Sequence, residues 1–384
     1  MKYLVLGAGM MGSAVAYDLA KSSAGNDVLL TDIDLRAAVH SAKTIGANVR
    51  PLRLDVNSHP DLVKAMEGCG AVISAVTYSV NVQVTRAALE AGVHMCDLGG
   101  NDDVVEEQIG FGHAAQTNGI TVIPNCGLAP GLINILAVTG SREFDEVDSI
   151  HLRVGGLPQH PRPPLNYQIV FSVEGLINEY VERASVIMDG RVILVDAMSG
   201  LEEIRFPEPF GPLEAFITSG GLSRLTAYFA GKVRNLDYKT IRYKGHCDKF
   251  KTLLELGFAT SEPMMGGGTV RTNREFFVNL LRKRLSFSDK DVVLARATIT
   301  GRRDGREKSL AYDFVDYYDD TTAMTAMMRT TAFPTSIIAQ MLASGVITQR
   351  GVFTPEVCVP GDLLIAELAK RNLTITQRVS ETGS

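Results

Sequence analysis

A glycine-rich loop near the start of the chain is the first place where residue types and spacing suggest chemistry. Residues 7–12 read GAGMMG, directly after an apolar run and directly before a helical pattern. In such a strand–loop–helix the first glycine permits a tight turn, the second lets the backbone approach a pyrophosphate, and the third lets the helix pack on the strand. The helix N-terminus supplies amide donors and a positive partial charge. The predicted cofactor-binding residues of this loop are Gly7, Gly9, Met10, Met11 and Gly12.

An acid after the second predicted strand indicates which dinucleotide binds. Asp32 stands twenty residues beyond Gly12, where its carboxylate can accept both ribose hydroxyls of the adenosine. The same charge repels a 2′-phosphate, so the sequence favours NAD over NADP. The alternatives are a flavin, another nucleotide, or a Rossmann fold without a ligand. Further cofactor contacts are predicted at the ends of the third and fourth strands, at Asp55, Val56, Ala75, Val76 and Thr77, with ordinary loop chemistry as an equal alternative for Asp55.

The elements that must position these residues follow a regular order over the first third of the chain. Apolar runs at residues 2–6, 28–30, 50–54, 71–76, 94–96 and 121–123 are predicted as strands. Helical patterns lie between them, at residues 13–21, 35–45, 60–66, 83–91 and 101–118. This alternation predicts an α/β fold that opens with a Rossmann domain built on a doubly wound parallel sheet.

The pattern changes after Pro124, which indicates a second domain. β-like runs lie at residues 149–154, 186–188, 192–195, 239–243, 292–300 and 309–317, with a helical pattern at 248–256. Asp-Gly pairs at 189–190 and 304–305 predict tight hairpin turns. We expect an α/β substrate domain with a mixed or antiparallel sheet, and a long apolar helix at 324–344 that returns to the first domain. The predicted domains are residues 1–125 with 325–384 for the cofactor, and residues 126–324 for the substrate and catalysis.

The composition of the 384-residue chain limits its partners and compartment. A formal net charge of −5 offers no general attraction to phosphate backbones or anionic lipid, so we expect neither nucleic acid nor membrane as partners. Five scattered cysteines form no CxxC pair, which fits a reducing compartment and argues against structural zinc. We therefore expect a cytoplasmic protein without a metal site that binds a small molecule and forms a homo-oligomer.

Several longer sequence blocks extend well beyond the glycine loop. They are YSVN at residues 78–81, DLGG at 97–100, GLAPGLINIL at 127–136, TIRYKGH at 240–246 and GVITQRGV at 345–352. In their order and content these blocks resemble the saccharopine dehydrogenase superfamily, and within it the L-lysine 6-dehydrogenase branch, nearly end to end. The resemblance implies a Rossmann domain completed by C-terminal helices, with an α/β substrate domain between its two parts.

The resemblance also implies a reaction on a small amino-acid substrate. It is the NAD-dependent oxidative deamination of the ε-amine of L-lysine to the 6-semialdehyde, which releases ammonia and cyclises to piperideine-6-carboxylate. Saccharopine-forming members typically carry an acid in the GLxPG block, where this chain has Ala129, and this departure disfavours saccharopine as the substrate. The alternatives are saccharopine or another amino acid or opine and, from another class of protein, a non-catalytic NAD-binding sensor.

Oxidation of an amine requires a free nitrogen lone pair, and hence a proton acceptor with a pKa near neutrality. His246 is the leading catalytic candidate, with a structural histidine as the alternative. Asp97 is a second candidate, for the substrate ammonium or the nicotinamide ribose, with a helix cap as the alternative. Tyr78 is a third, to hydrogen-bond the substrate or stack near the nicotinamide, with a packed aromatic as the alternative.

Two further residues are candidates for holding the substrate. Arg242 can offer a planar fork to an α-carboxylate, with an ion pair at the surface or between domains as the alternative. Glu174 can read a distal ammonium, although an acid on an exposed helix face is the more ordinary interpretation. We expect these side chains to be gathered at the reaction site.

Overall fold

The computed structural model describes residues 1–263, 272–287 and 289–381. The chain forms two compact units. Unit 1 comprises Met1–Thr139 with Met328–Thr374, and unit 2 comprises Gly140–Met327 with Ile375–Ser384. The first junction therefore follows Thr139 rather than residue 125, and most of helix α7 (Leu132–Ser141) belongs to unit 1.

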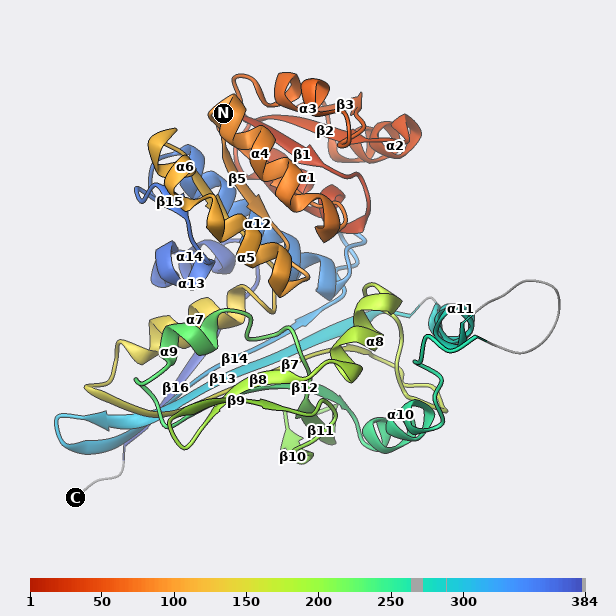
Figure 1. Ribbon diagram of the computed structural model, residues 1–384, viewed down its shortest axis with the longest axis vertical. Coiled ribbons are helices and arrows are strands. Elements are labelled where there is room, and N and C mark those ends of the chain that lie inside the picture. Colours follow the sequence, from red (N-terminus) through yellow and green to blue (C-terminus); the bar gives the residue numbers. More distant parts are fainter. Residues whose placement is uncertain (264–271, 288, 382–384) are drawn as a thin grey trace. The chain divides into compact units, whose positions relative to one another are not determined.

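A seven-stranded sheet forms the centre of unit 1, in the order β15-β6-β5-β4-β1-β2-β3 (Figure 1). Its strands are β1 (Lys2–Leu6), β2 (Asp27–Asp32), β3 (Val49–Arg53), β4 (Ala71–Ser74), β5 (His94–Asp97), β6 (Thr121–Ile123) and β15 (Gly351–Val352). All neighbouring strands of this sheet are parallel. The order β3-β2-β1-β4-β5-β6 is that of a doubly wound dinucleotide-binding fold, which confirms the predicted fold class.

Helices connect the strands of unit 1 and cover the sheet. They are α1 (Met10–Ser22), α2 (Leu35–Ile45), α3 (His59–Met66), α4 (Asn81–Ala91), α5 (Asp102–Gly110), α6 (Gly112–Thr117), α12 (Ala326–Ala343), α13 (Pro355–Cys358) and α14 (Gly361–Ala369), with a short 3₁₀ helix η1 (Tyr78–Val80). Leu4 and Leu6 of β1 pack in one apolar cluster with Leu62 and Met66 of α3 and Val84 of α4. Burial of these side chains fixes the sheet that carries the glycine loop.

The C-terminal helices return to the Rossmann sheet, as predicted. Buried Asp18 of α1 accepts hydrogen bonds at 2.6 Å from Ser336 of α12 and at 2.6 Å from Arg371, just beyond α14. A buried charged pair stabilises a fold only when both groups have their hydrogen bonds satisfied. These contacts therefore specify how α12 and α14 pack against α1. Within the ranges that the structure describes, no helix has the length and apolar character needed to cross a membrane.

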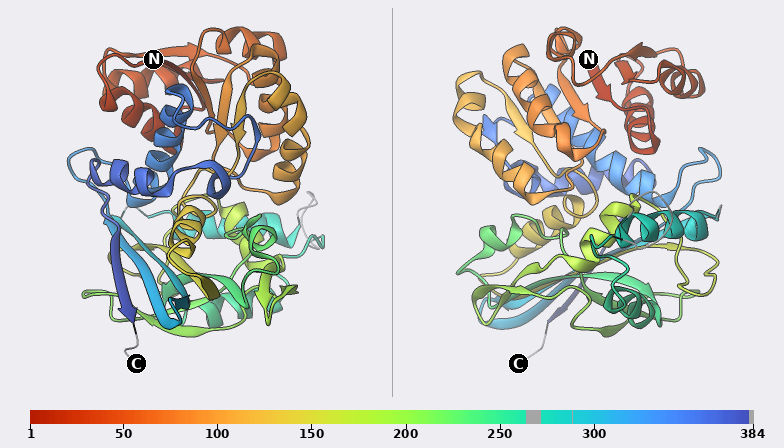
Figure 2. Two further views of the ribbon diagram at one scale, coloured as in Figure 1. Left: turned by 90° about the vertical axis from the view of Figure 1, so that its left-hand side faces the viewer. Right: turned by 45° about the vertical axis from the view of Figure 1, so that its right-hand side comes forward.

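Unit 2 is built on a mixed sheet of nine strands in which β10-β11-β12-β7-β13-β14-β16 form the main path. The strands are β7 (Glu146–Pro158), β8 (Ala184–Met188), β9 (Arg191–Val195), β10 (Glu202–Arg205), β11 (Pro212–Ile217), β12 (Asn235–Tyr243), β13 (Asp291–Arg303), β14 (Arg306–Tyr317) and β16 (Thr376–Glu381). Only β12 and β7 run parallel; the other pairs are antiparallel. Figure 2 shows β16, in dark blue, alongside β14. The end of the chain thus belongs to unit 2, although the sequence assigned all of residues 325–384 to the cofactor domain.

The two predicted Asp-Gly hairpins are present. Asp189 and Gly190 join β8 to β9 with φ of 49° and 78°, and Asp304 and Gly305 join β13 to β14 with φ of 51° and 74°. Positive φ at both central residues matches the twist of the flanking strands, which is why Asp-Gly is favoured there. Strands β10, β11 and β16 were not predicted: β10 and β16 are short and largely polar, and β11 is a six-residue segment that begins with a proline.

Helices cover one face of the unit 2 sheet. They are α8 (Val173–Val181), α9 (Leu225–Phe229), α10 (His246–Glu255) and α11 (Asn273–Leu285). Three of them share an apolar cluster with Phe216 of β11, which is in register with Thr240 of β12. Because side chains alternate along a strand, Arg242 shares this helix-covered face with Thr240, whereas Lys239 lies on the opposite face.

Candidate functional site

Glycine serves a different purpose at each of the three positions in the loop between β1 and α1. Gly7 has a φ of +96°, and a Cβ there would lie 2.8 Å from the carbonyl oxygen of Ala75. A Cβ on Gly12 would lie 1.9 Å from the carbonyl oxygen of Gly7. A Cβ on Gly9 would meet no atom within 4 Å. The fold itself therefore requires Gly7 and Gly12, whereas Gly9 keeps open the space that a pyrophosphate needs.

The first turn of α1 has free amides that can bind an anion. Its N-cap is Gly9, which has no side chain to bond the free amides, and no acid lies in the first turn. Met10 is largely exposed and Met11 is partly buried, so the turn ends at an accessible surface. Uncapped amides at the positive end of the helix bind phosphate oxygens.

Asp32 is held against the glycine loop. Its Oδ2 accepts a hydrogen bond from the amide of Ala8 at 2.9 Å, and its Oδ1 accepts one from the amide of Asp34 at 2.9 Å. The carboxylate is only partly buried and has lone pairs left for a diol. A second acid, Asp34, pairs with exposed Arg36 at 3.0 Å. These residues fit the adenosine ribose of a nicotinamide dinucleotide.

The other predicted cofactor residues divide into two groups. A Cβ on Gly7 would meet Val76 at 3.1 Å as well as Ala75, so the end of β4 lies against the loop, and exposed Thr77 follows. Asp55 instead accepts hydrogen bonds from the backbone and side-chain amides of Asn57, at 2.9 and 3.0 Å, which is a local turn. Val56 packs against the core of unit 1. Local turn structure accounts for Asp55, and core packing accounts for Val56.

Asp97, predicted as catalytic, is enclosed in unit 1. Its Oδ1 accepts from the amides of Gly99 at 2.7 Å and Asn125 at 3.1 Å, and its Oδ2 accepts from Nε2 of Gln108 at 2.8 Å. Burial raises the pKa of Asp97, against the opposing effect of these bonds. The side chain has no exposed surface and joins the loops after β5 and β6. In this geometry Asp97 holds the two loops together and exposes no atom to a substrate, so its catalytic role stays a prediction without support from the site's geometry.

Tyr78 remains accessible at the carboxyl edge of the same sheet. It is 37% exposed and stands in η1, directly after the end of β4. A Cβ on Gly100 would lie 2.9 Å from its ring, so the DLGG loop packs closely against it. Ligands of open α/β sheets bind outside this edge, and the position of Tyr78 is compatible with its predicted role.

His246, predicted as the proton acceptor, is fixed at both ring nitrogens. Nδ1 lies 2.9 Å from the carbonyl oxygen of Leu165 and must donate to it. Nε2 lies 3.1 Å from the hydroxyl of Tyr180 and accepts from it. Burial, assisted by the charge of Arg242, lowers the pKa of His246 to about 3. The imidazole is neutral near pH 7 and its lone pair is engaged by Tyr180, so in this geometry it orients Tyr180, and its role as a base stays a prediction.

Arg242 is buried beside two tyrosine rings. Its side chain stacks 4.6 Å from the ring centre of Tyr167, and only 3% of the residue is exposed. Nε donates to the Tyr180 hydroxyl at 2.9 Å, and Nη1 donates to its neighbour's carbonyl oxygen at 2.9 Å. Within residues 1–263, 272–287 and 289–381, Arg242 forms no ion pair with a carboxylate.

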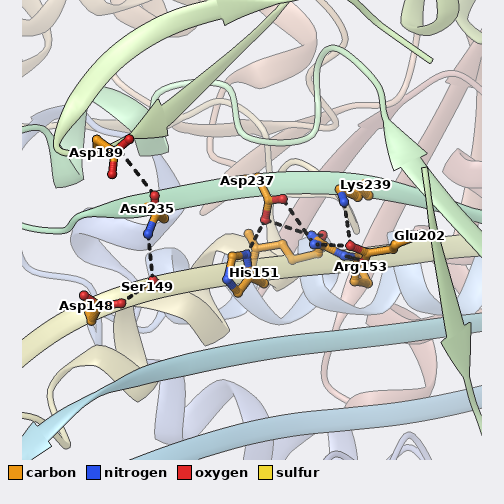
Figure 3. Close-up of polar contacts among 10 residues, drawn as sticks. Asp148, Ser149, His151, Arg153, Asp189, Glu202, Asn235, Asp237 and Lys239 are labelled. Carbon is orange, nitrogen blue, oxygen red and sulfur yellow. Dashed lines mark hydrogen bonds and ion pairs between the residues drawn. The ribbon is translucent and has the colours of Figure 1, made fainter. Parts of the chain in front are cut away.

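Arg153 is a second buried arginine of this sheet, and it is paired with carboxylates. It lies on the opposite face, is 6% exposed, and bonds Glu202 at 2.5 Å and Asp237 at 2.9 Å (Figure 3). Lys239 completes the network through Glu202, and His151 through Asp237. Burying a charge is costly unless it is paired. Arg153 meets this requirement with two carboxylates, whereas the guanidinium of Arg242 bonds a hydroxyl and a carbonyl oxygen.

Glu174, predicted to bind a distal ammonium group, lies at the surface. It occupies the first turn of α8, where Ser172 caps the amide of Gly175 at 3.2 Å. Its carboxylate pairs with exposed Arg282 at 2.9 Å. Burial alone would raise the pKa of Glu174, but hydrogen bonds and Arg282 lower it overall. The ion pair and the helix dipole explain this acid without a substrate.

Three residues near Arg242 were missed by the sequence analysis: Tyr167, Glu179 and Tyr180. Tyr167 is fully buried, and its ring centre lies 4.6 Å from the guanidinium carbon of Arg242. Tyr180 links Arg242 to His246. Glu179 lies outside the buried positions of α8, where an acid is ordinary, so the sequence carried no signal that singled it out.

Two protein-family models match this chain, one after the other. The family described as "Saccharopine dehydrogenase NADP binding domain" matches residues 3–123, and "Saccharopine dehydrogenase C-terminal domain" matches residues 127–373. The chain belongs to the saccharopine dehydrogenase family. Unit 1 thus contains the family's nicotinamide-dinucleotide domain.

Curated relatives in the saccharopine dehydrogenase family are distant. Mitochondrial alpha-aminoadipic semialdehyde synthase of Mus musculus is 24% identical over 424 residues, covering 92% of this chain and 45% of the mouse protein. Carboxyaminopropylagmatine dehydrogenase of Synechocystis sp. is 23% identical over 389 residues, covering 97% and 96%. The chain therefore spans about half the length of the mouse relative.

Two solved structures have folds similar to that of this chain. Apo saccharopine dehydrogenase (L-Glu forming) from Saccharomyces cerevisiae has a TM-score of 0.80 at 19% identity, with 99% of both chains covered. Homospermidine synthase from Legionella pneumophila, in complex with NAD, has a TM-score of 0.69 at 11% identity, covering 99% of this chain and 91% of that one. At these identities the likeness establishes that the saccharopine dehydrogenase fold is shared.

Proposed function

We propose that this chain is an NAD-dependent dehydrogenase that deaminates the ε-amine of L-lysine to the 6-semialdehyde, with release of ammonia. The observation that carries the proposal is the buried guanidinium of Arg242 in unit 2, which forms no ion pair within the described residues. An arginine fork binds a carboxylate through two parallel hydrogen bonds, and such bonds are strongest where water is excluded. Arg242 is therefore assigned to the substrate's α-carboxylate.

The residues around Arg242 hold its guanidinium in a fixed orientation. Tyr180 accepts from Nε and so orients the guanidinium, and His246 accepts from Tyr180 in turn. The Tyr167 ring supports the guanidinium plane by a cation–π contact. NAD, when bound, supplies the nicotinamide carbon that takes hydride from the carbon bearing the amine. His246 is a positioning residue in this scheme.

NAD is proposed over NADP, although the matching family domain is described as NADP-binding. Asp32 keeps a partly exposed carboxylate beside the glycine loop. A 2′-phosphate there would meet this negative charge at close range, whereas a ribose diol can donate to it. Exposed Arg36 is already paired with Asp34.

Saccharopine is the second candidate substrate. It is favoured by the names of the family and of the yeast protein whose fold this chain shares. It is disfavoured by Ala129, because the resemblance implies an acid at that position in saccharopine-forming members. Saccharopine also carries α-carboxylates, so Arg242 does not separate the two candidates.

The test is product formation. The purified protein is incubated with NAD and, in separate reactions, L-lysine and saccharopine, while NADH absorbance is followed. Ammonia and a piperideine product from L-lysine would support the proposal. NADH formation with saccharopine, accompanied by glutamate and not by ammonia, would replace it with the second candidate.

A homo-oligomer forms part of the proposal. Strand β9 pairs only with β8 among the described strands, and its apolar residues Val192, Ile193 and Leu194 are exposed. An apolar edge strand is a template for pairing with another chain. Light scattering after size exclusion measures the assembly, and a single species at the chain mass of 41.5 kDa would contradict it.

A further inference from the structure

An arginine at the start of α2 is held in an ion pair by the acid that caps this helix. Nε and Nη2 of Arg36 donate to the two carboxylate oxygens of Asp34, at 3.1 and 3.0 Å. The backbone amide of Arg36 also donates to this carboxylate at 3.0 Å, since Asp34 is the N-cap of α2. Two parallel bonds of this kind use the same edge of a guanidinium that binds a phosphate.

A continuous set of hydrogen bonds connects this ion pair to the glycine loop. The carboxylate of Asp32 accepts from the amide of Ala8 in the loop and from the amide of Asp34, each at 2.9 Å. Asp34 therefore stands between the carboxylate assigned to the ribose diol and the guanidinium of Arg36. A cation released from Asp34 would lie beside the place where NADP carries its 2′-phosphate.

The position of Arg36 depends on the charge of Asp34. The side chain of Arg36 is 92% exposed, so the ion pair, rather than packing, holds the guanidinium in place. Exposed ion pairs are weak and open readily. A single change of charge at Asp34 should therefore be sufficient to make Arg36 available to another anion.

We propose that Asp34 is a second specificity-determining residue for the cofactor, because its carboxylate holds Arg36 away from a 2′-phosphate. The inference rests on the proposed function, since it takes the glycine loop and Asp32 as the cofactor site. Asp32 selects the diol by accepting its hydrogen bonds, whereas Asp34 acts through Arg36. Selectivity for NAD over NADP is thus divided between two acids, and loss of either one relaxes it.

The first experiment removes the charge of Asp34 and keeps its capping oxygen. Asparagine caps a helix about as well as aspartate does, so Asp34→Asn should leave the start of α2 intact. The dissociation constants of NADH and NADPH are measured with the full-length protein by nucleotide fluorescence. We expect NADPH to gain about 10-fold in affinity relative to NADH, the scale of one charged hydrogen bond. An unchanged ratio of the two dissociation constants in a folded variant would overturn the proposal.

The second experiment asks whether Arg36 carries the gain. In Asp34→Asn/Arg36→Gln the released guanidinium is absent, so the ratio should return to within about threefold of the wild-type value. A gain that survives in this double variant would come from the lower negative charge alone and would overturn the proposal. Arg53 of β3, which donates to the carbonyl oxygen of Ile33 at 3.3 Å, is present in every variant, so its effect on NADPH cancels in the comparison.

Asp27 offers a matched control on the same two strands. It begins β2, and its exposed carboxylate accepts from Nε of Arg50 on β3 at 3.0 Å. This ion pair lies at the amino end of β2, whereas cofactors bind at the carboxyl edge of the sheet. Asp27→Asn should leave both dissociation constants within about twofold. A shift of the ratio equal to that of Asp34→Asn would indicate a general effect of surface charge and would overturn the proposal.

The preference for NAD and the role of Asp34 fail separately. A wild type that binds NADPH more tightly than NADH would reject the proposed preference, and a further shift toward NADPH in Asp34→Asn that requires Arg36 would still support the role of Asp34. Preference for NADH with the same ratio in Asp34→Asn would reject the role of Asp34 alone. Absence of binding by both nucleotides would reject both proposals. Because binding is measured without an amino acid, the outcome of the L-lysine assay does not affect this test.

Discussion

The hydroxyl of Tyr180 lies 3.1 Å from Nε2 of His246, and this contact determines what the histidine can do. Because Nδ1 donates to the Leu165 carbonyl, Nε2 must accept. Tyr180 in turn accepts from Arg242 at 2.9 Å. The result is a directed chain of hydrogen bonds that ends on a guanidinium, and it makes His246 an orienting group for Arg242.

We expect His246→Gln to remain active. Glutamine offers one donor and one acceptor, as the neutral imidazole does, and a group with a pKa of about 3 does not titrate near neutrality. The value of kcat/KM should fall by less than about tenfold, with an unchanged pH profile. A general base would cost about 10²–10⁴ and lose a limb of that profile, so steady-state kinetics across pH separates the roles. His246→Phe, which leaves Tyr180 without its acceptor, should raise KM more than it lowers kcat.

Gly9→Val should abolish NADH binding in a folded protein. A side chain there meets no protein atom within 4 Å and instead fills the approach of the pyrophosphate. NADH fluorescence enhancement reports binding, and circular dichroism with thermal melting reports folding. Gly12→Val is the matched control, expected to lose the fold because its Cβ would lie 1.9 Å from Gly7. Normal NADH fluorescence in Gly9→Val would remove this loop from the cofactor site.

Asp32→Asn should weaken NAD and relax discrimination against NADP. Asparagine retains an oxygen for the amide of Ala8 but loses the charge that binds the diol and repels a 2′-phosphate. We expect a loss of roughly 1–3 kcal/mol in NAD binding, about 5- to 150-fold in Kd. Titration with both cofactors measures it. Unchanged dissociation constants in a folded variant would show that Asp32 serves the loop alone.

Arg242→Met and Arg153→Met should have opposite consequences. Arg242→Met removes a buried charge that forms no ion pair within the described residues, so the free energy of unfolding should change little while KM for the amino acid rises about 100-fold. Arg153→Met strips Asp237 and Glu202 of their shared partner and should cost roughly 1.5–3 kcal/mol. Urea unfolding and steady-state kinetics test both. A strongly destabilised Arg242→Met with unchanged KM would assign Arg242 a structural role.

The cofactor half of the protein could be predicted because its signals are local. The turn at Gly7, the helix at Met10 and the acid at the end of β2 each depend on residues within one βαβ unit. Backbone φ, strand alternation and helix termini are properties of short segments, so GAGMMG followed by Asp32 was sufficient. The predicted turns at 189–190 and 304–305 are present for the same reason.

The substrate half depends on contacts that only the tertiary structure creates. Burial lowers the pKa of His246 to about 3 and raises that of Glu179 to about 7, and the charge of Arg242 acts on both groups. Asp97 was enclosed by donors from the loop after β6 and from α5. Residue type fixes the ordinary pKa of a group, but desolvation and neighbouring charges decide its protonation, and these are set by the packing of α8, α10 and β12.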